Sequence, residues 1–121
     1  MTTHILASRT VRAQYHHVIA GKIETGYPRN ILVQVLHTDS GDRFGVGMDQ
    51  FHRAELAPDT ARLIRHAGKT PAGNEAIIYA DIPRAAYDEL VTAAQQRFAY
   101  PLRLNEKTVE SPSEQAQGEE V

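Results

Sequence analysis

The chain has 121 residues, a formal net charge of −2 and no cysteine, and 41% of its residues are hydrophobic. This length fits one domain, and domains of this size bury roughly two-thirds of the surface that the unfolded chain exposes. No apolar run approaches the roughly 18 residues that would span a bilayer, and the N-terminus lacks the basic-then-apolar order of a secretory signal. Without cysteine, disulfides and thiolate metal sites are excluded, so we expect a protein of the reducing cytoplasm with no contact with a membrane.

The first half of the chain reads as three strands. Alternating apolar and polar residues predict a long, half-buried strand over residues 11–24. Apolar residues on both faces predict a central strand over residues 30–38, and Asp, Ser and Gly at residues 39–41 predict a tight hairpin turn. Residues 43–48 would form the return strand, with Met48 among the residues facing the core. Together these segments predict an antiparallel meander.

Two helices are predicted in the second half, with a strand between them. Pro58 and Gly68 carry the signals for the start and the end of a helix. A short apolar run over residues 75–82 predicts a buried strand. From Pro83 to Pro101 a second, strongly one-sided helix is expected. The apolar stripe of the first helix consists of Thr60, Leu63, Ile64 and Ala67, and that of the second of Tyr87, Leu90, Val91, Ala94 and Phe98.

The resulting order, β-β-β-α-β-α, predicts an α+β domain. We expect an antiparallel sheet built on the three-stranded meander, with the helices packed on one face. The domain would occupy residues 1–104. Residues 105–121 lack aromatic side chains and are rich in Glu, Ser and Gln, which predicts a disordered acidic tail. Four of the 15 acidic residues lie among the last dozen positions, whereas all 13 Lys and Arg residues lie at or before Lys107.

Residues 43–56, RFGVGMDQFHRAEL, contain two closely spaced glycines. A phosphate-binding loop needs its glycines between a strand and a helix N-terminus, so that backbone N–H groups converge on the anion. Gly45 and Gly47 instead alternate within the predicted return strand. We therefore interpret them as positions where something bulky, a helix or an aromatic ring, approaches the strand closely.

The same stretch contains the nearest approach to a metal site. Asp49, His52 and Glu55 follow one another at intervals of three, and adjacent members of a helix at this spacing can chelate an ion. The first and last would be about 9 Å apart along a helix, which suits one ion poorly. We therefore expect no metal and no cofactor, and we interpret the stretch as a strand leading into the first turns of a helix.

A catalytic constellation can be assembled from the histidines. His17 and His37, with Asp49 or Asp81, could supply a general base and an orienting carboxylate. His16 and His17 are neighbours on a strand and must point to opposite faces. No nucleophile with an evident base is present, and Asp81 would equally cap the second helix. A non-enzymatic role is therefore favoured over an enzyme.

A binding surface is predicted from exposed basic and aromatic residues. The first helix would place several basic residues together, the first strand would add a basic stripe, and the turn after it a tyrosine for stacking. The members of this surface are Arg12, Lys22, Tyr27, Arg29, Arg62, Arg65, His66 and Lys69. The modest net charge weighs against nucleic acid as the first choice of partner.

These observations favour a non-enzymatic module that binds another macromolecule. A protein partner is preferred, as for an adaptor or an inhibitor, a type that includes the anti-defence proteins of phages and mobile elements. An accessory protein that binds nucleic acid is the alternative, and a small enzyme with a His and carboxylate pair is the third hypothesis. A homodimer is compatible with the sequence.

Overall fold

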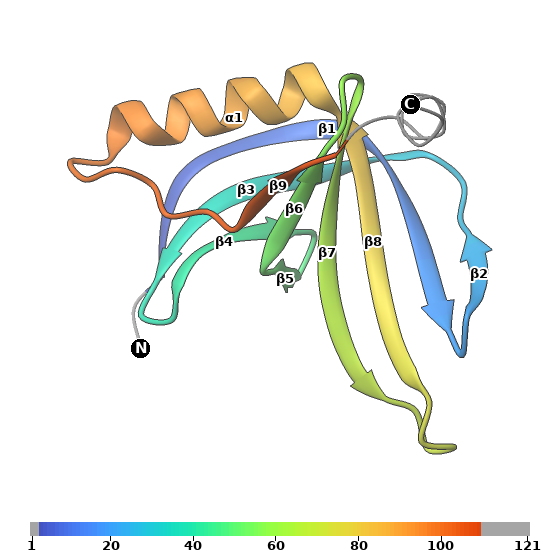
Figure 1. Ribbon diagram of the computed structural model, residues 1–121. Helices are drawn as coiled ribbons and strands as arrows, with labels where there is room; N and C mark the ends of the chain where they lie inside the picture. Colours follow the sequence, from blue (N-terminus) through green and yellow to red (C-terminus); the bar gives the residue numbers. More distant parts are fainter. Residues whose placement is uncertain (1–2, 110–121) are drawn as a thin grey trace, which may run out of the picture.

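The computed structural model of this protein describes residues 3–109, which form nine strands and one helix (Figure 1). The elements, in chain order, are β1 (Thr3–Ile19), β2 (Lys22–Thr25), β3 (Arg29–Thr38), β4 (Gly41–Val46), β5 (Asp49–Phe51), β6 (Arg53–Leu56), β7 (Thr60–Lys69), β8 (Glu75–Pro83), α1 (Arg84–Arg97) and β9 (Glu106–Thr108). In this part of the chain no helix is long and apolar enough to cross a membrane.

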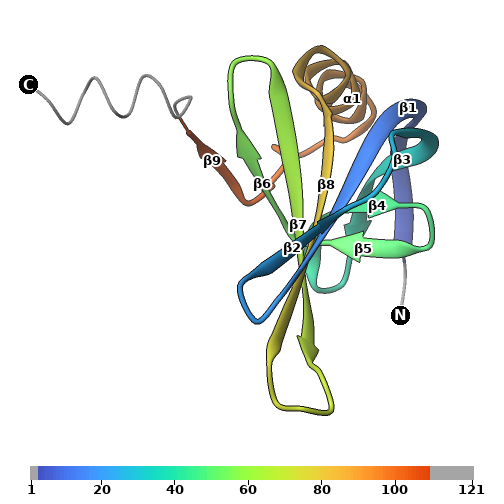
Figure 2. The same ribbon diagram turned by 90° about the vertical axis from the view of Figure 1, so that its right-hand side faces the viewer.

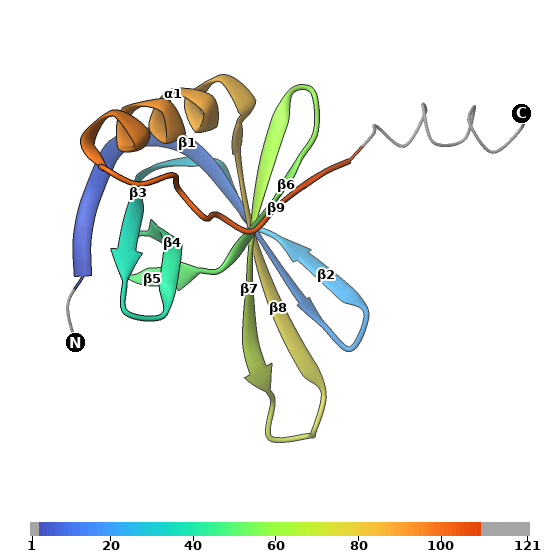
Figure 3. The ribbon, with the colours of Figure 1, turned by 60° about the vertical axis from the view of Figure 1, so that its left-hand side comes forward.

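The strands form one sheet in the order β5-β4-β3-β1-β8-β7-β6-β9, and β2 pairs with β1 outside this path. All pairings are antiparallel except that of β6 with β9, which is parallel. The first part of β1, Thr3–Ala13, pairs with β3. The second part, Gln14–Ile19, pairs with β8, and its last four residues also pair with β2. One long strand therefore joins two groups of strands that face different ways (Figure 3).

The predicted α+β fold with two helices is wrong, because residues 58–68 do not form a helix. They contribute the strand β7, which pairs with β8 from Thr60 to Lys69. Alternation along β7 buries Ala61 and Leu63 in the core and directs Arg62 to the other face. The apolar stripe on which the helix was predicted also fits this strand, and the apolar residues of β8 supply a partner for it. Gly68 lies at a bulge in this pairing rather than at a helix end.

The predicted meander is correct only in that β1, β3 and β4 are antiparallel neighbours, and three features differ. The predicted strand over residues 11–24 is a hairpin, because Ala20 and Gly21, both with positive φ, turn the chain between β1 and β2. Gly47 (φ 61°) ends the return strand, so Met48 is fully exposed instead of facing the core. The stretch after it does not enter a helix but continues as β5 and β6. The hairpin between β3 and β4 forms as predicted, with Gly41 at φ 119°.

Close approach to the glycine strand occurs at Gly45, but the neighbours are side chains of the paired strand and not the predicted helix or aromatic ring; at Gly47 a Cβ atom would be 3.7 Å from the hydroxyl of Tyr15, an ordinary contact. At Gly45 a Cβ atom would lie 3.2 Å from the side-chain oxygen of Gln34 and 3.2 Å from a methyl carbon of Leu36, both on the paired strand β3. Such contacts are shorter than ordinary van der Waals separations, so the absence of a side chain lets the neighbours on β3 cross this strand.

The helix that follows Pro83 is confirmed as α1, which lies across β1 (Figure 1). Its buried residues are Ala86, Tyr87, Leu90 and Ala94. The phenol of Tyr87 packs against Phe44 with ring centroids 5.5 Å apart and donates a hydrogen bond to Glu106 of β9. This contact fastens the end of the described chain to the helix. The strand β9 lies inside the segment predicted as a tail, so the ordered part continues to Val109; residues 110–121 of that segment lie outside the described residues.

The core lies between α1 and the inner face of the curved sheet. Its largest fully buried side chains are those of Tyr87, Phe44, Phe51, Leu63, Ile82, Val33, Val35 and Val46. Both groups of strands contribute to this set. A single core therefore fills the body of the molecule.

Two hairpins extend beyond this core, away from α1 (Figures 1 and 2). They comprise residues 16–25, from β1 and β2, and residues 65–79, from β7 and β8, and they are joined by the pairing of β1 with β8. We call these two segments the β-arm. None of its residues is buried. The β-arm is thus a piece of sheet that neither a helix nor a second sheet covers.

The substitution Ala67→Thr distinguishes the strand β7 from the helix predicted at the same residues, and Leu63→Ala serves as the comparison at a buried position. Leu63→Ala should lower the free energy of unfolding by about 2–5 kcal/mol, because Leu63 is fully buried. Ala67→Thr should change it by less than about 0.5 kcal/mol, because Ala67 is exposed on a strand. Urea denaturation of both variants measures these values. A loss of several kcal/mol for Ala67→Thr would contradict the strand.

Candidate functional site

A row of polar side chains crosses the sheet at the base of the β-arm. Asp81 of β8 accepts two hydrogen bonds from Arg62 of β7, from Nε to Oδ1 at 2.8 Å and from Nη2 to Oδ2 at 3.0 Å. The ring of His16, on β1, lies between Asp81 and Thr25 of β2, with Nε2 2.9 Å from the carboxylate and Nδ1 2.9 Å from the hydroxyl. We call these four residues the polar row.

The pairing register explains why the polar row forms. Asp81 lies opposite Arg62 on one side and Gln14 on the other, and His16 lies opposite Thr25. All of these side chains therefore project from the same face, which we call the outer face because it is opposite the core. The neighbouring His17 projects from the inner face, so it cannot reach the same carboxylate.

The charges of Arg62 and Asp81 pair within the polar row. The hydrogen bond to Asp81 raises the pKa of Arg62 above its ordinary value, and this effect outweighs the opposing effect of burial. The guanidinium also lies 4.6 Å from the centroid of the Tyr79 ring. The side chains of His16 and Asp81 are 14% and 17% exposed. The carboxylate is therefore partly removed from water and is neutralised by its neighbours.

Thr25, His16 and Asp81 stand in the order of a hydroxyl, an imidazole and a carboxylate, as in nucleophilic catalysis. An acyl-transfer site also needs donors that converge on a developing oxyanion. The backbone N–H next to Thr25, that of Gly26, is already bound to the carbonyl of Tyr15 at 2.9 Å. Arg62 in addition holds both oxygens of Asp81. These contacts favour a role in joining four strands over a role in catalysis.

A second polar pair lies at the other end of the molecule, at the hairpin between β3 and β4. His37 Nδ1 is 2.7 Å from Oδ1 of Asp42, whose side chain is only 4% exposed. The second oxygen of Asp42 accepts a hydrogen bond from the backbone N–H of Arg103 at 2.6 Å. Phe98 and Tyr100, from the segment after α1, stand beside this pair and line the same pocket. We call this region the His37 pocket.

The structure does not bring the predicted catalytic residues together. His37 lies opposite His4, near the start of β1, whereas His17 lies near the end of that strand, opposite Ile78. Asp49 forms a salt bridge with Arg65 at 2.9 Å. His17 and His37 therefore lie far apart, near opposite ends of β1.

Two residues that the sequence reasoning overlooked make the contacts instead. His16, not His17, meets Asp81, which holds Arg62 and His16 instead of capping α1; Pro83 occupies the N-cap position without a side-chain cap. Asp42 partners His37. The second pairing was accessible from sequence, because a turn at residues 39–41 places positions 37 and 42 directly opposite each other.

The three residues considered as metal ligands, Asp49, His52 and Glu55, lie in extended segments and not in a helix. Asp49 belongs to β5, Glu55 belongs to β6, and His52 lies between the two strands. Each has a different neighbour, with Glu55 3.9 Å from Arg53 and His52 beside His66. Within residues 3–109 no group of three or more His, Cys, Asp or Glu side chains is placed to hold a metal ion.

The predicted binding surface is divided by the strand geometry of β7. Arg62 and His66 project from the outer face and Arg65 from the inner face, where Asp49 pairs with it. The remaining members of the set are distributed around the molecule: Arg12 is exposed on β1, Lys22 and Lys69 lie on the β-arm, Tyr27 is 92% exposed between β2 and β3, and Arg29 lies 5.2 Å from the ring centroid of Tyr15. They do not form one basic patch.

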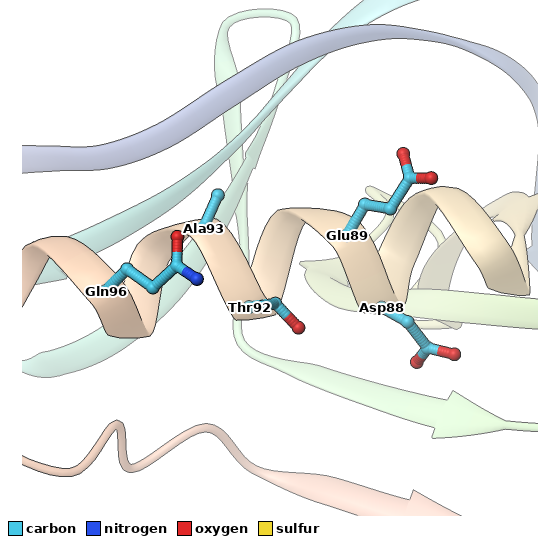
Figure 4. Close-up of a pocket in the computed structure, with 5 residues that line it drawn as sticks. All are labelled: Asp88, Glu89, Thr92, Ala93 and Gln96. Carbon is cyan, nitrogen blue, oxygen red and sulfur yellow. The ribbon is translucent and has the colours of Figure 1, made fainter.

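A shallow hollow lies on the exposed side of α1 (Figure 4). It is lined by Asp88, Glu89, Thr92, Ala93 and Gln96. All five residues come from one helix, and the two carboxylates already pair, Asp88 with Arg84 and Glu89 with Arg9. With no second wall and no free charge, this hollow has the character of an ordinary helix surface.

Comparisons with protein-family models, with curated proteins and with solved structures found no match to this chain.

The polar row predicts a measurable coupling between Arg62 and Asp81. Asp81→Ala should lower the free energy of unfolding by about 1–3 kcal/mol, because two partners lose a charged acceptor. A double-mutant cycle with Arg62→Ala should give a coupling near 1 kcal/mol, at the low end because the side chain of Arg62 is 40% exposed. The matched cycle on Arg84 and Asp88, a pair one helical turn apart on α1 whose carboxylate is 58% exposed, should give only about 0.3–0.5 kcal/mol. Equal couplings in the two cycles would refute the special role of the row.

His52 predicts a loss of stability in acid. Its pKa is lowered from 6.5 by burial first, and then by the positive charges of His66, Arg43 and Arg53. The unfolded chain therefore binds a proton more readily, so the stabilisation is present above pH 6.5 and is lost as the pH falls through the lowered pKa. Unfolding by urea at a series of pH values should show this fall. His52→Gln should reduce it, and His66→Gln should reduce it in part; an unchanged fall in His52→Gln would contradict the assignment.

Proposed function

We propose that this chain binds a protein partner through the outer face of the β-arm. The observation that carries the proposal is an apolar row on that face. Val18 of β1 lies opposite Ile23 of β2 on one side and opposite Ile77 of β8 on the other, so their three side chains form a continuous line across three strands. We call these residues the apolar row.

Exposure of the apolar row supports an interface. Ile23 is 65% exposed, and Val18 and Ile77 are half-buried. Single exposed aliphatic residues are common, but one that continues into a row of partly accessible aliphatic residues across three strands supports an interaction surface. The polar row lies beside the apolar row on the same face. On β7, His66 lies opposite Ile77 and continues the apolar row with a polar side chain. An apolar centre with a polar border is the usual composition of a protein interface.

The edge of β2 offers a second mode of contact. Among the described strands, β2 pairs only with β1, so its other edge presents unpaired backbone groups. A partner could add a strand at this edge and at the same time cover Ile23. An adaptor or an inhibitor, including an anti-defence protein of the reducing cytoplasm, would use such a surface.

Charge favours a protein over nucleic acid as the partner. Within the β-arm the basic residues are Lys22, Arg65 and Lys69, against Glu24 and Glu75. Arg65 is paired with Asp49, which leaves little positive charge for phosphate groups. Nucleic acid is therefore the alternative outcome of the experiment below.

Ile23→Asp should abolish partner binding, because it places a charge at the exposed end of the apolar row. Ile5→Asp is the matched control, since Ile5 is also an exposed isoleucine (56%) but lies near the start of β1. The tagged parent protein and both variants are used to capture material from host lysate, with and without nuclease. We expect a protein that the parent and Ile5→Asp retain under both conditions and that Ile23→Asp loses.

Three outcomes would count against this function. If the captured material is lost after nuclease treatment, nucleic acid and not protein would be the favoured partner. Equal retention by the parent and Ile23→Asp would exclude the apolar row as the contact. Light scattering on the purified chain tests a homodimer, and a dimer that Ile23→Asp dissociates would identify a second copy as the occupant of this face.

A further inference from the structure

We propose that the His37 pocket binds a free mononucleotide, with the base among the aromatic rings and the phosphate beside Arg103. The pocket has a volume of about 370 Å³, within the usual range for small-molecule sites. It is lined by His37, Gly41, Asp42, Phe98, Tyr100, Pro101 and Arg103. This inference is independent of the β-arm, which extends from the opposite side of the body (Figure 1).

Three rings form the wall for a planar base. The centroids of His37 and Phe98 are 4.7 Å apart, and those of Phe98 and Tyr100 are 5.8 Å apart with the rings at 72°. Tyr100 is 70% exposed, so one of its faces is open. Bases stack readily on such side chains because every base has a π-face.

Gln95 holds this wall in place. Its amide nitrogen donates to the carbonyl of Tyr100 at 2.8 Å, and its amide oxygen accepts from the backbone N–H of Leu102 at 2.8 Å. The segment that carries the rings is therefore fastened to the last turns of α1. A preformed wall costs less conformational entropy on binding than one that must be ordered by the ligand.

Asp42 is the strongest indication that the pocket is a constructed site. A buried carboxylate is costly unless it is paired, and both oxygens of Asp42 have partners. One partner is the His37 ring, so in the neutral imidazole the proton sits on Nδ1 and Nε2 is left as an acceptor. The other is the backbone N–H of Arg103. The buried charge thus orients one pocket side chain and anchors the backbone of another.

Positive charge borders the pocket. The salt bridges within residues 3–109 include none to Arg103, and its backbone contact to Asp42 leaves the guanidinium outside the buried pair. His4 of β1 stacks on His37 with centroids 6.3 Å apart. Both oxygens of Asp42 are engaged in hydrogen bonds, and Asp39, in the adjacent turn, also has an interaction partner. A phosphate is an anion that an arginine side chain binds well.

The test is a titration followed by the NMR signals of the histidine rings, at one fixed pH. The ligands are AMP, UMP, adenosine and inorganic phosphate. We expect saturable shifts of the His37 signals with AMP or UMP, and binding at least about tenfold weaker for adenosine and for phosphate, because each contains only half of the recognised chemistry. Absence of a saturable shift with both nucleotides would overturn the proposal, as would phosphate alone binding as tightly as AMP.

Matched variants show whether binding uses the pocket. Arg103→Gln keeps the backbone N–H that holds Asp42 and should weaken nucleotide binding about tenfold. Tyr100→Ala should weaken it about fivefold or more, through lost stacking. The controls are Arg12→Gln and Tyr27→Ala, exposed residues of the same types elsewhere, which should stay within about twofold of the parent. Equal losses in the controls would refute the site.

One further arm distinguishes a free nucleotide from nucleic acid. A single strand of ten nucleotides should bind no more tightly than AMP if the pocket takes one free nucleotide. Binding of the strand at least about tenfold more tightly, with the same dependence on Arg103, would overturn the free-nucleotide form of the proposal.

Discussion

The backbone pairing of β1 is the constraint on which the rest of the structure depends. Its first part pairs with β3 and its last residues pair with β8 and β2, so the sheet changes direction along a single strand. The helix α1 packs on β1 and closes the core there. His4, near one end, borders the His37 pocket, and Val18, near the other, belongs to the apolar row. Both proposed surfaces are therefore positioned by one element.

This arrangement divides the molecule into a body with a dense core and a β-arm with none. In the body, side chains such as those of Phe51 and Val33 are completely buried, and their burial supplies the main stabilisation. In the β-arm this term is small, because no residue is fully buried and Ile78 is packed only partly against the core. Its order depends mainly on backbone hydrogen bonds and cross-strand side-chain pairs. The polar row lies at the boundary between the body and the β-arm. Its bidentate pair between Arg62 and Asp81 joins β7 to β8, and His16 and Thr25 extend the connection to β1 and β2.

Sequence reasoning succeeded where the signal was local and failed where pairing decided the structure. Pro83 and the one-sided stripe after it suffice to predict α1, and the turn at residues 39–41 suffices for its hairpin. The apolar residues of β7 fit a helix and a strand equally well, so the choice depends on β8, which a local pattern cannot show. The same limit applies to the site. Asp81 and His16 are 65 residues apart in the chain, and only the register of β1 against β8 reveals that they meet.

Salt bridges within the fold explain why the arginines that stand out in the sequence do not mark a binding surface. Arg62 and Arg65, which as part of a helix would have formed a basic patch, each pair with a carboxylate on opposite faces of β7. A charge satisfied inside the protein has little attraction left for a partner, and separating it from its carboxylate would cost free energy. In both proposals recognition depends on groups that the fold leaves exposed, namely Ile23 of the apolar row and the ring of Tyr100 beside Arg103. The buried carboxylate of Asp42 would orient residues of the pocket rather than contact a ligand.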